Sequence, residues 1–254
     1  MSLTQPVLEP SSIPFPFQVR SITTPPFDLA VAPSVSVVIA AMNEARNLPH
    51  VLPKIPRWID EIILVDGGSS DNTISVAERL CPDIVIVHQT GKGKGGALRQ
   101  GFEAATKEII VALDADGSTA PEEIPVFVGA LVAGADYVKG SRFLQGGGTA
   151  DMTLLRKLGN LGLVYLVTLF YGGKFSDLCY GYNAFWRRSL PDLALDADGF
   201  EIETMMNIRA LKANLRVTEV ASFESERIHG ESNLQTFKDG WRVLKTIVNE
   251  KINA

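Results

Sequence analysis

The stretch "IIVALDADGS", residues 109 to 118, runs from an apolar segment directly into two carboxylates, Asp114 and Asp116. Such a short apolar run, followed by polar residues and a turn, is typical of a buried strand. Alternation along an extended chain puts both carboxylates on one face, where they repel unless a cation lies between them. Oxygen ligands of this kind suit Mg²⁺ or Mn²⁺. The alternative is a loop whose carboxylates cap the helix that Pro121 begins.

Similar apolar runs recur along the chain and alternate with segments of helical periodicity. They predict strands at 35–41, 61–65, 84–87, 109–113 and 135–139, and helices near 44–54, 72–80, 95–106 and 121–133. This alternation predicts an α/β fold, with one mostly parallel sheet flanked by helices in a single domain. We assign the domain to residues 34–235, between a proline-rich arm at 1–33 and an amphipathic C-terminal helix at 236–254.

Composition limits the class of protein. The 254 residues are 46% hydrophobic and 21% charged, which is typical of a soluble globular chain. The net charge of −5 argues against a nucleic-acid partner. Two cysteines without metal-ligand spacing fit a reducing compartment, so we expect a cytoplasmic protein. The apolar stretch 161–171 is shorter than the roughly 20 residues that cross a bilayer, and we expect neither a spanning helix nor a secretory signal.

Polar residues follow each of the first four predicted strands. Ligands of parallel α/β sheets bind beyond the carboxyl ends of the strands, so these residues are candidate ligand contacts. Asp66 could accept hydrogen bonds from a base or ribose, or could fix the turn that follows it, in which we expect Asp71 to cap a helix. The loop "GKGKGG", residues 91 to 96, offers N–H groups and ammonium charge to a phosphate, although alone such a loop is more often a flexible turn.

Two helical stretches are strongly apolar on at least one side. Residues 156–171 combine a basic start with a nearly continuous apolar run, and a core helix is the first interpretation. The same pattern also suits a helix that lies at a membrane surface. The stripe of Phe237, Trp241 and Leu244 in the C-terminal helix could likewise pack on the domain.

Taken together, the ordered motifs resemble family 2 glycosyltransferases of the GT-A fold, over about residues 35 to 245. The segments that carry the resemblance are "VSVVIAAMNEARN", "ILVDGGSSDNT" and "ALDADGS". Within that family the sequence is similar to polyprenyl-phosphate sugar synthases of the dolichyl-phosphate mannose synthase type. That likeness rests on "GKGKGGALRQGFEAA", "VKGSRF", "RKLGN", "SDLCYGYNAFWRR" and "ERIHGESN".

The resemblance implies a role for particular residues of this sequence. A nucleotide-sugar donor would be bound by Asn43, Glu44, Asp66, Lys94, Asp114, Ala115 and Arg227. The metal ion, Mg²⁺ or Mn²⁺, would be held by Asp114 and Asp116, with His229 as a further candidate ligand. The acceptor phosphate would meet Arg142, Arg156 and Asn160. Catalytic roles would fall to Asp116, Arg227, Asp177 and Glu201. Many relatives have Gln where this chain has Ser118, which leaves the third metal ligand open, and many carry C-terminal spanning helices that this sequence lacks.

The implied activity is inverting, metal-dependent transfer of a sugar from GDP-mannose or UDP-glucose to a polyprenyl phosphate, by a cytoplasmic protein in peripheral contact with the membrane. A sugar hydroxyl is the alternative acceptor, and it would need a carboxylate base. A nucleotidyltransferase should have a Gly-rich loop after its first strand, and "AAMNEARN" has no glycine. Asp114, Asp116 and Arg227 argue against a nucleotide-sugar-binding domain without catalysis.

Overall fold

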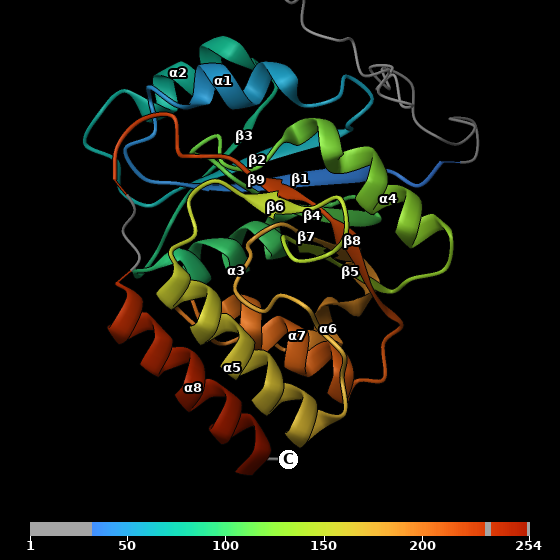
Figure 1. Cartoon of the computed structure of the whole chain (residues 1–254). Helices are drawn as coiled ribbons and strands as arrows, with labels where there is room; N and C mark the ends of the chain where they lie inside the picture. Colours follow the sequence, from blue (N-terminus) through green and yellow to red (C-terminus); the bar gives the residue numbers. More distant parts are fainter. Residues whose placement is uncertain (1–31, 232–234, 253–254) are drawn as a thin grey trace, which may run out of the picture.

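A seven-stranded sheet forms the centre of the computed structural model, which describes residues 32–231 and 235–252 (Figure 1). Its strand order is β3-β2-β1-β4-β7-β5-β8. The strands are β1 (Val35–Ala41), β2 (Glu61–Asp66), β3 (Val85–His88), β4 (Ile109–Asp114), β5 (Tyr137–Ser141), β7 (Asn183–Trp186) and β8 (Val217–Ala221). Only β7 runs antiparallel to its neighbours. Short strands β6 (Gly148–Thr149) and β9 (Phe223–Glu224) pair separately.

Helices cover both faces of the sheet (Figure 1). One face carries α1 (Leu48–Val51), α2 (Thr73–Leu80) and α4 (Ile124–Val132). The other carries α3 (Lys94–Ala104), α6 (Leu190–Leu193) and α7 (Ile202–Lys212), and beneath them lie α5 (Leu154–Tyr171) and α8 (Thr236–Ile252). Residues 1–31 of the predicted proline-rich arm lie outside the described residues.

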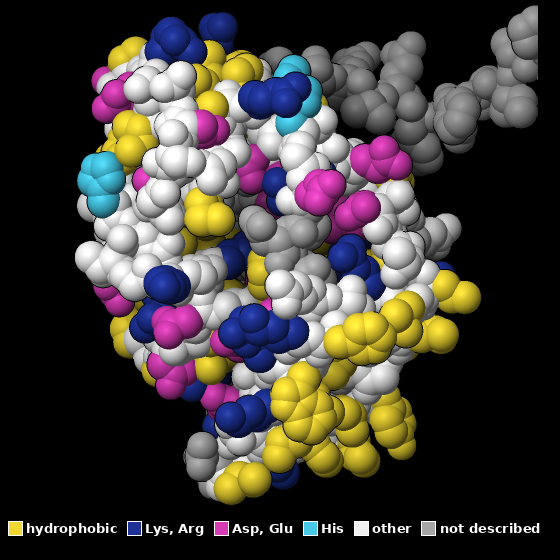
Figure 2. All heavy atoms as spheres, turned by 90° about the vertical axis from the view of Figure 1, so that its left-hand side faces the viewer, with side chains coloured by type: hydrophobic (Ala, Val, Ile, Leu, Met, Phe, Trp, Pro, Cys, Tyr) yellow, Lys and Arg dark blue, Asp and Glu magenta, His cyan; other side chains and the backbone are white. Residues whose placement is uncertain are grey.

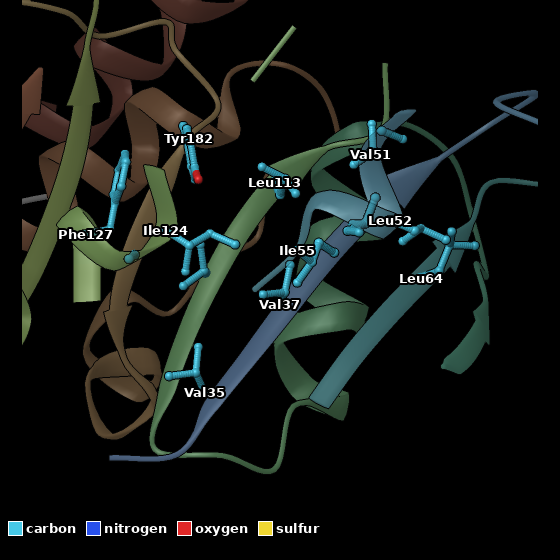
Figure 3. Close-up of a cluster of buried hydrophobic side chains, with 14 of the residues drawn as sticks. Val35, Val37, Val51, Leu52, Ile55, Leu64, Leu113, Ile124, Phe127 and Tyr182 are labelled. Carbon is cyan, nitrogen blue, oxygen red and sulfur yellow. The ribbon is translucent and has the colours of Figure 1, made fainter. Parts of the chain in front are cut away.

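The core explains why the central strands are apolar throughout. Val37 and Ile39 of β1 pack toward α1, α2 and α4, where Figure 3 shows Val37 beside other buried side chains. Val38 faces the opposite layer with α3 and α7. A Cβ on Gly101 would lie 2.4 Å from Val38 Cγ1, so the close packing of α3 on β1 requires glycine there. Burial on both faces therefore produces a continuous apolar run instead of alternation.

The predicted α/β architecture with a mostly parallel sheet is confirmed, as are all five predicted strands, although the fifth begins two residues later than expected, at Tyr137. The helix predicted at 44–54 is wrong in length. Asn43 has a φ of +61° and a turn follows it, so α1 begins only at Leu48. Pro53 has no N–H to continue the α-helical pattern, and the chain proceeds as a 3₁₀ helix over Leu52–Lys54.

The core-helix interpretation of residues 156–171 is wrong. Only 11% of α5 is buried, and its buried residues are Asn160 and Val167. The helix packs by a narrow stripe onto α7 and α8 and leaves the rest of its surface outward. In the described part of the chain, α5 is the one helix long and apolar enough, by length and composition alone, to cross a membrane. Helical periodicity in the sequence does not reveal whether another element covers an apolar face.

The sheet order places the site. From β1 the chain builds β2 and β3 on one side and then returns to form β4 on the other. This reversal opens a crevice beyond the carboxyl ends of β1 and β4, which is where open α/β sheets bind ligands. The backbone register pairs Ala40 of β1 with Asp114 of β4, and Ala41 with Asp66 of β2. Three polar strand ends thus meet at one edge of the sheet.

Candidate active site

A cavity of about 1220 Å³ opens at this edge. Figure 2 views the molecule from that side and shows acidic and basic side chains around its hollowed centre. Asp114 and Asp116 both line the cavity, and their side chains are 25% and 16% exposed. Asp116 Oδ1 accepts hydrogen bonds from the backbone N–H (2.9 Å) and hydroxyl (2.7 Å) of Ser118. The predicted carboxylate pair is therefore accessible, and Ser118 orients its second member.

Two cationic side chains from distant segments pair with these carboxylates. Lys94 Nζ, at the start of α3, lies 2.7 Å from Asp114 Oδ1 and 3.0 Å from Glu203 Oε1. Burial alone would lower the pKa of Lys94, but the two carboxylates outweigh burial and raise it. Arg227 lies 2.9 Å from Asp116 Oδ2 and 2.9 Å from Glu44 Oε1. We refer to these six side chains as the ion-pair network.

The charge of the ion-pair network fits a divalent cation. Its four carboxylates and two cations leave a net charge of −2, which one Mg²⁺ or Mn²⁺ would neutralise. Within the described residues no cluster of three His, Cys, Asp or Glu side chains is arranged to hold an ion. Mg²⁺ commonly uses one or two carboxylates together with substrate phosphate oxygens. Asp114 and Asp116 would supply two carboxylates to such a site, and their metal role stays a prediction.

Two residues predicted to contact the nucleotide-sugar donor, Asp66 and Asn43, instead stabilise the neighbouring turn. Asp66 accepts hydrogen bonds from the N–H groups of Gly68 and Ser69, each at 3.1 Å from Oδ2. Asn43 Oδ1 accepts from the Ser70 N–H at 2.8 Å. Neither side chain lines the main cavity, whereas Glu44, Lys94, Ala115 and Arg227 do. Asn43 does line the smaller adjoining pocket. For all of these residues, contact with the nucleotide-sugar donor stays a prediction.

The Gly/Lys-rich loop is held against the segment before α7. The N–H groups of Gly95 and Gly96 donate to the Asp198 carbonyl, at 2.9 and 3.3 Å, so they are not available to a phosphate. A Cβ on Gly93 would lie 2.1 Å from the same carbonyl oxygen, which excludes any larger residue. Lys92 and Gly93 line the cavity. The end of the loop is therefore packed against the segment before α7 and forms part of the cavity wall.

On the acceptor side, Arg142 is fully engaged within the protein. Its Nε and Nη2 donate to Asp177 at 2.6 and 2.9 Å, and its Nη1 donates to Glu224 at 3.0 Å. Its guanidinium also lies over the Tyr180 ring. Asp177 is fully buried and does not line the cavity. The acceptor role of Arg142 and the catalytic role of Asp177 stay predictions, and the geometry makes this pair a structural support.

Arg156 and Asn160 face the cavity from α5, one helical turn apart. Asn160 is 4% exposed, and its Oδ1 accepts a hydrogen bond from the Leu178 N–H at 3.1 Å. Its Nδ2 is buried and has no hydrogen-bond partner in the structure. A buried N–H₂ group without a partner is unfavourable unless a ligand accepts its hydrogen bond. Arg156 is only loosely paired, 3.8 Å from Asp151.

Two other predicted site residues lie apart from the carboxylate pair. Glu201 Oε1 accepts from the Gly199 N–H at 3.2 Å, and Glu201 does not line the cavity. The His229 ring lies against the His50 ring, with centroids 5.8 Å apart, in the smaller pocket. The structure does not bring either residue to Asp114 and Asp116, and their catalytic and metal roles stay predictions.

Several cavity residues had been assigned no site role from the sequence. Phe200 and Glu203 flank Glu201 in the sequence and line the cavity, whereas Glu201 does not. Helical spacing from the start of α7 could have indicated that Glu203 and Glu201 face different directions. Glu224 and Gln89 also line the cavity. Glu224 lies in β9, a short strand that was not predicted, and no local signal marks it. Gln89 comes two residues after the strand predicted at 84–87, so its position alone made it a candidate.

The fold and the site together define a nucleotide-sugar-dependent glycosyltransferase of the GT-A class. The model of glycosyl transferase family 2 matches residues 36–193, which is more than half of the sequence. The chain belongs to glycosyl transferase family 2. The resemblance recognised in the sequence and the predicted GT-A fold are thereby confirmed.

Named relatives extend over most of the chain. It is 33% identical over 215 residues to the polyprenol monophosphomannose synthase of Mycolicibacterium smegmatis, covering 78% of this chain and 80% of that protein. It is 31% identical to the undecaprenyl-phosphate mannosyltransferase of Micrococcus luteus, covering 85% and 91%. Among solved structures, glucosyl-3-phosphoglycerate synthase from Mycobacterium tuberculosis, in complex with Mn²⁺ and uridine diphosphate, has a TM-score of 0.68 and 22% identity, covering 90% and 85%. That last likeness concerns the fold.

Replacing Asp177 with Asn should lower the free energy of unfolding by about 3 kcal/mol at pH 7, because Arg142 loses its buried partner. Burial alone would raise the pKa of Asp177, but hydrogen bonds and charge from Arg142 hold it below its usual range. The pair therefore contributes its full stability above about pH 4 and loses it as the pH falls further. Urea denaturation from pH 7 to pH 3 measures this difference.

Asp192→Asn, at an exposed position, is the control for the loss of one charge. An unchanged unfolding free energy in Asp177→Asn would contradict the support role. A difference in unfolding free energy between the two proteins that already disappears between pH 7 and pH 5 would contradict it as well.

Proposed function

We propose that this glycosyltransferase transfers a sugar, with inversion, from a nucleotide-sugar donor to the phosphate of a polyprenyl lipid. The observation that carries the proposal is the side of the cavity formed by α5, where Arg156 and the unpartnered Asn160 amide face the cavity beside apolar side chains. The printed names of the two relatives, a polyprenol monophosphomannose synthase and an undecaprenyl-phosphate mannosyltransferase, support the same acceptor and favour mannose. GDP-mannose and UDP-glucose are the donors to compare first.

The shape of the cavity supports an apolar acceptor chain. The cavity extends between α5 and α8, and its walls include Leu155 and Leu163 on one helix and Trp241 and Leu244 on the other. We call this part the α5/α8 groove. Gly159 lines it, and a Cβ there would meet nothing within 4 Å, so the groove is open at that point. A polyprenyl chain whose phosphate is bound at Arg156 would leave the cavity along this groove.

In the proposed reaction, Asp114 and Asp116 would hold the metal ion, which would supply Lewis-acid stabilisation of the departing phosphate. Arg227 already lies 2.9 Å from Asp116, so its guanidinium is close enough to stabilise the negative charge that develops on the leaving group. Lys94 and the Gly/Lys-rich loop line the same cavity. These groups account for departure of the nucleoside diphosphate.

The acceptor needs orientation more than deprotonation. The second pKa of a phosphate monoester is about 6, so the lipid phosphate is mostly a dianion at pH 7 and is itself the nucleophile. Arg156 and the Asn160 amide would donate hydrogen bonds to its oxygens and aim one of them at the anomeric carbon. Attack from the face opposite the leaving group inverts that centre. No general base is required.

A hydroxyl compound is the competing acceptor. Its attack would require a carboxylate base, and Glu203 and Glu224 both line the cavity. Both carboxylates are already bound to cations, Glu203 to Lys94 and Glu224 to Arg142. Each of these carboxylates is therefore occupied by a cation, which favours the phosphate acceptor.

We extend the proposal to the membrane surface that would supply such a lipid. Exposed apolar side chains form an outward face on both helices, which we call the α5/α8 surface: Leu154, Leu158, Leu161, Tyr165, Leu169, Phe237, Trp241, Val248 and Ile252. Figure 2 shows hydrophobic side chains gathered on the lower part of this side, with Lys and Arg beside them. Exposed Lys157, Lys238 and Lys245 lie on the same helices. Apolar residues flanked by basic ones suit an anionic lipid surface.

A transfer assay tests the proposed function. Purified protein with Mg²⁺ or Mn²⁺, labelled UDP- and GDP-sugars and a short polyprenyl phosphate should produce label in the organic phase. Asp116→Asn should reduce this transfer at least about 100-fold, because the charge of the leaving group loses its stabilisation. Asp83→Asn, exposed at the opposite edge of the sheet, is the control. Metal-dependent release of free sugar alone would instead support the hydroxyl acceptor.

Gly159→Leu should block the α5/α8 groove. We expect the KM for polyprenyl phosphate to rise about tenfold or more, while donor hydrolysis without acceptor is unchanged. Folding should persist because the site is open and Leu favours a helix more than Gly does. Gly162→Leu is the matched control, since Gly162 lies on the same helix, is equally open and does not line the cavity. Equal effects of the two substitutions would contradict a groove for the acceptor.

Leu161→Ser combined with Leu169→Ser should weaken sedimentation with anionic vesicles at least about tenfold, because each buried Leu contributes about 1.5–3 kcal/mol. Neither residue lines the cavity, so transfer to a short, water-soluble acceptor should be unaffected. Val126→Ser with Val132→Ser, exposed on α4, is the control. If an active preparation does not sediment with vesicles, the α5/α8 surface does not bind lipid.

A further inference from the structure

The geometry points to Glu203 as a positioning residue for the metal site, a role that rests on the metal dependence in the proposed function. We infer that its carboxylate shares the Lys94 ammonium with Asp114, and so prevents Lys94 from neutralising Asp114 completely. Asp114 then keeps negative charge for the divalent cation. Glu203 would not touch the reacting atoms in this role; it acts through Lys94.

Three elements converge on the Lys94 ammonium. Asp114 ends β4, Glu203 lies in the first turn of α7, and Lys94 begins α3. The two Nζ to oxygen distances, 2.7 Å to Asp114 and 3.0 Å to Glu203, are nearly equal, so the cation is shared. A Cβ on Gly181 would lie 2.8 Å from Nζ and 2.9 Å from Asp114 Oδ2, so glycine leaves the space that this arrangement occupies.

Burial of Glu203 has no evident structural purpose. Its side chain is 4% exposed, and among the described residues Lys94 is its one ion-pair partner. Burying a carboxylate carries a desolvation cost, and an apolar side chain of similar volume often stabilises a fold as well or better. Glu203 also lines the cavity, within the same ion-pair network as Asp114. Its charge is therefore best explained by an effect on the ligand site.

Removal of the Glu203 charge has two electrostatic effects on metal affinity, and both act in the same direction. Without the Glu203 charge, the Lys94 ammonium would pair with Asp114 alone and would compete with a divalent cation for that carboxylate. Removal of one negative charge from the network also weakens its attraction for any cation. Both effects lower metal affinity. Residues that orient metal ligands without binding the metal typically change affinity about 10- to 100-fold when replaced.

The test measures Mn²⁺ binding directly, by electron paramagnetic resonance titration of the purified protein with UDP or GDP present and no acceptor. Glu203→Gln, which keeps the shape and removes the charge, should raise the Kd for Mn²⁺ about 10- to 100-fold. Asp83→Asn removes an equal charge at an exposed position and should leave the Kd unchanged. Thermal unfolding establishes that each variant is folded.

A double variant separates positioning from a general structural role. Lys94→Met with Glu203→Gln removes both charges, restores the local net charge and frees Asp114, so its Kd should return to within about threefold of the unsubstituted protein. Glu203→Asp keeps the charge and should also lie within about threefold. If Glu203→Gln does not fold, the double variant carries the test, since weak Mn²⁺ binding by it would overturn the inference.

A Kd for Glu203→Gln within twofold of the unsubstituted value would overturn the inference. A double variant as weak as Glu203→Gln, or an equal loss in Glu203→Asp, would overturn it too. Failure of the unsubstituted protein to bind Mn²⁺ would overturn the metal assignment itself. Normal binding by every variant would overturn only the role of Glu203 and leave the proposed function intact.

Discussion

The negative charge gathered beyond the carboxyl ends of β1 and β4 is the constraint on which the site depends. Asp114 and Asp116 repel each other, and Glu44 lies close enough to share Arg227 with Asp116. The cations that balance them come from elsewhere in the chain, Lys94 from α3 and Arg227 from the segment after β9. These groups come together only in the folded sheet. The net charge of the ion-pair network is still negative. Under the proposed function, this negative charge attracts the metal ion and the donor diphosphate that accompanies it.

The two groups of charges in the cavity differ in how completely they are paired. Around Arg142, all three guanidinium nitrogens donate to Asp177 or Glu224, which fixes the orientation of the group. Arg156 is loosely held and the Asn160 amide nitrogen has no partner. Two carboxylates hold the Arg142 guanidinium in place, whereas the buried Asn160 amide has a donor that a ligand can use. This distinction separates residues that motif resemblance alone had grouped together.

Features that depend on local sequence patterns could be predicted, whereas contacts between distant segments could not. Buried strands such as β1 and β4, and the carboxylates at their ends, have local patterns, and these were predicted. The pairing of Asp177 with Arg142 and of Glu203 with Lys94 joins distant segments and leaves no local pattern. The exposure of α5 was not predictable either, because an apolar periodicity specifies a face and not what covers it.

Helix α5 joins the cavity to the outer surface. Arg156 and Asn160, four residues apart, face inward, whereas Leu158, Leu161 and Tyr165 face outward. A helix with 3.6 residues per turn presents both sets at once. Under the proposed function, the phosphate would bind on the inner side while its apolar chain follows the α5/α8 groove toward the outer one. The exposed apolar face, unfavourable in water, is then required by an acceptor that is charged at one end and apolar along the rest of its length.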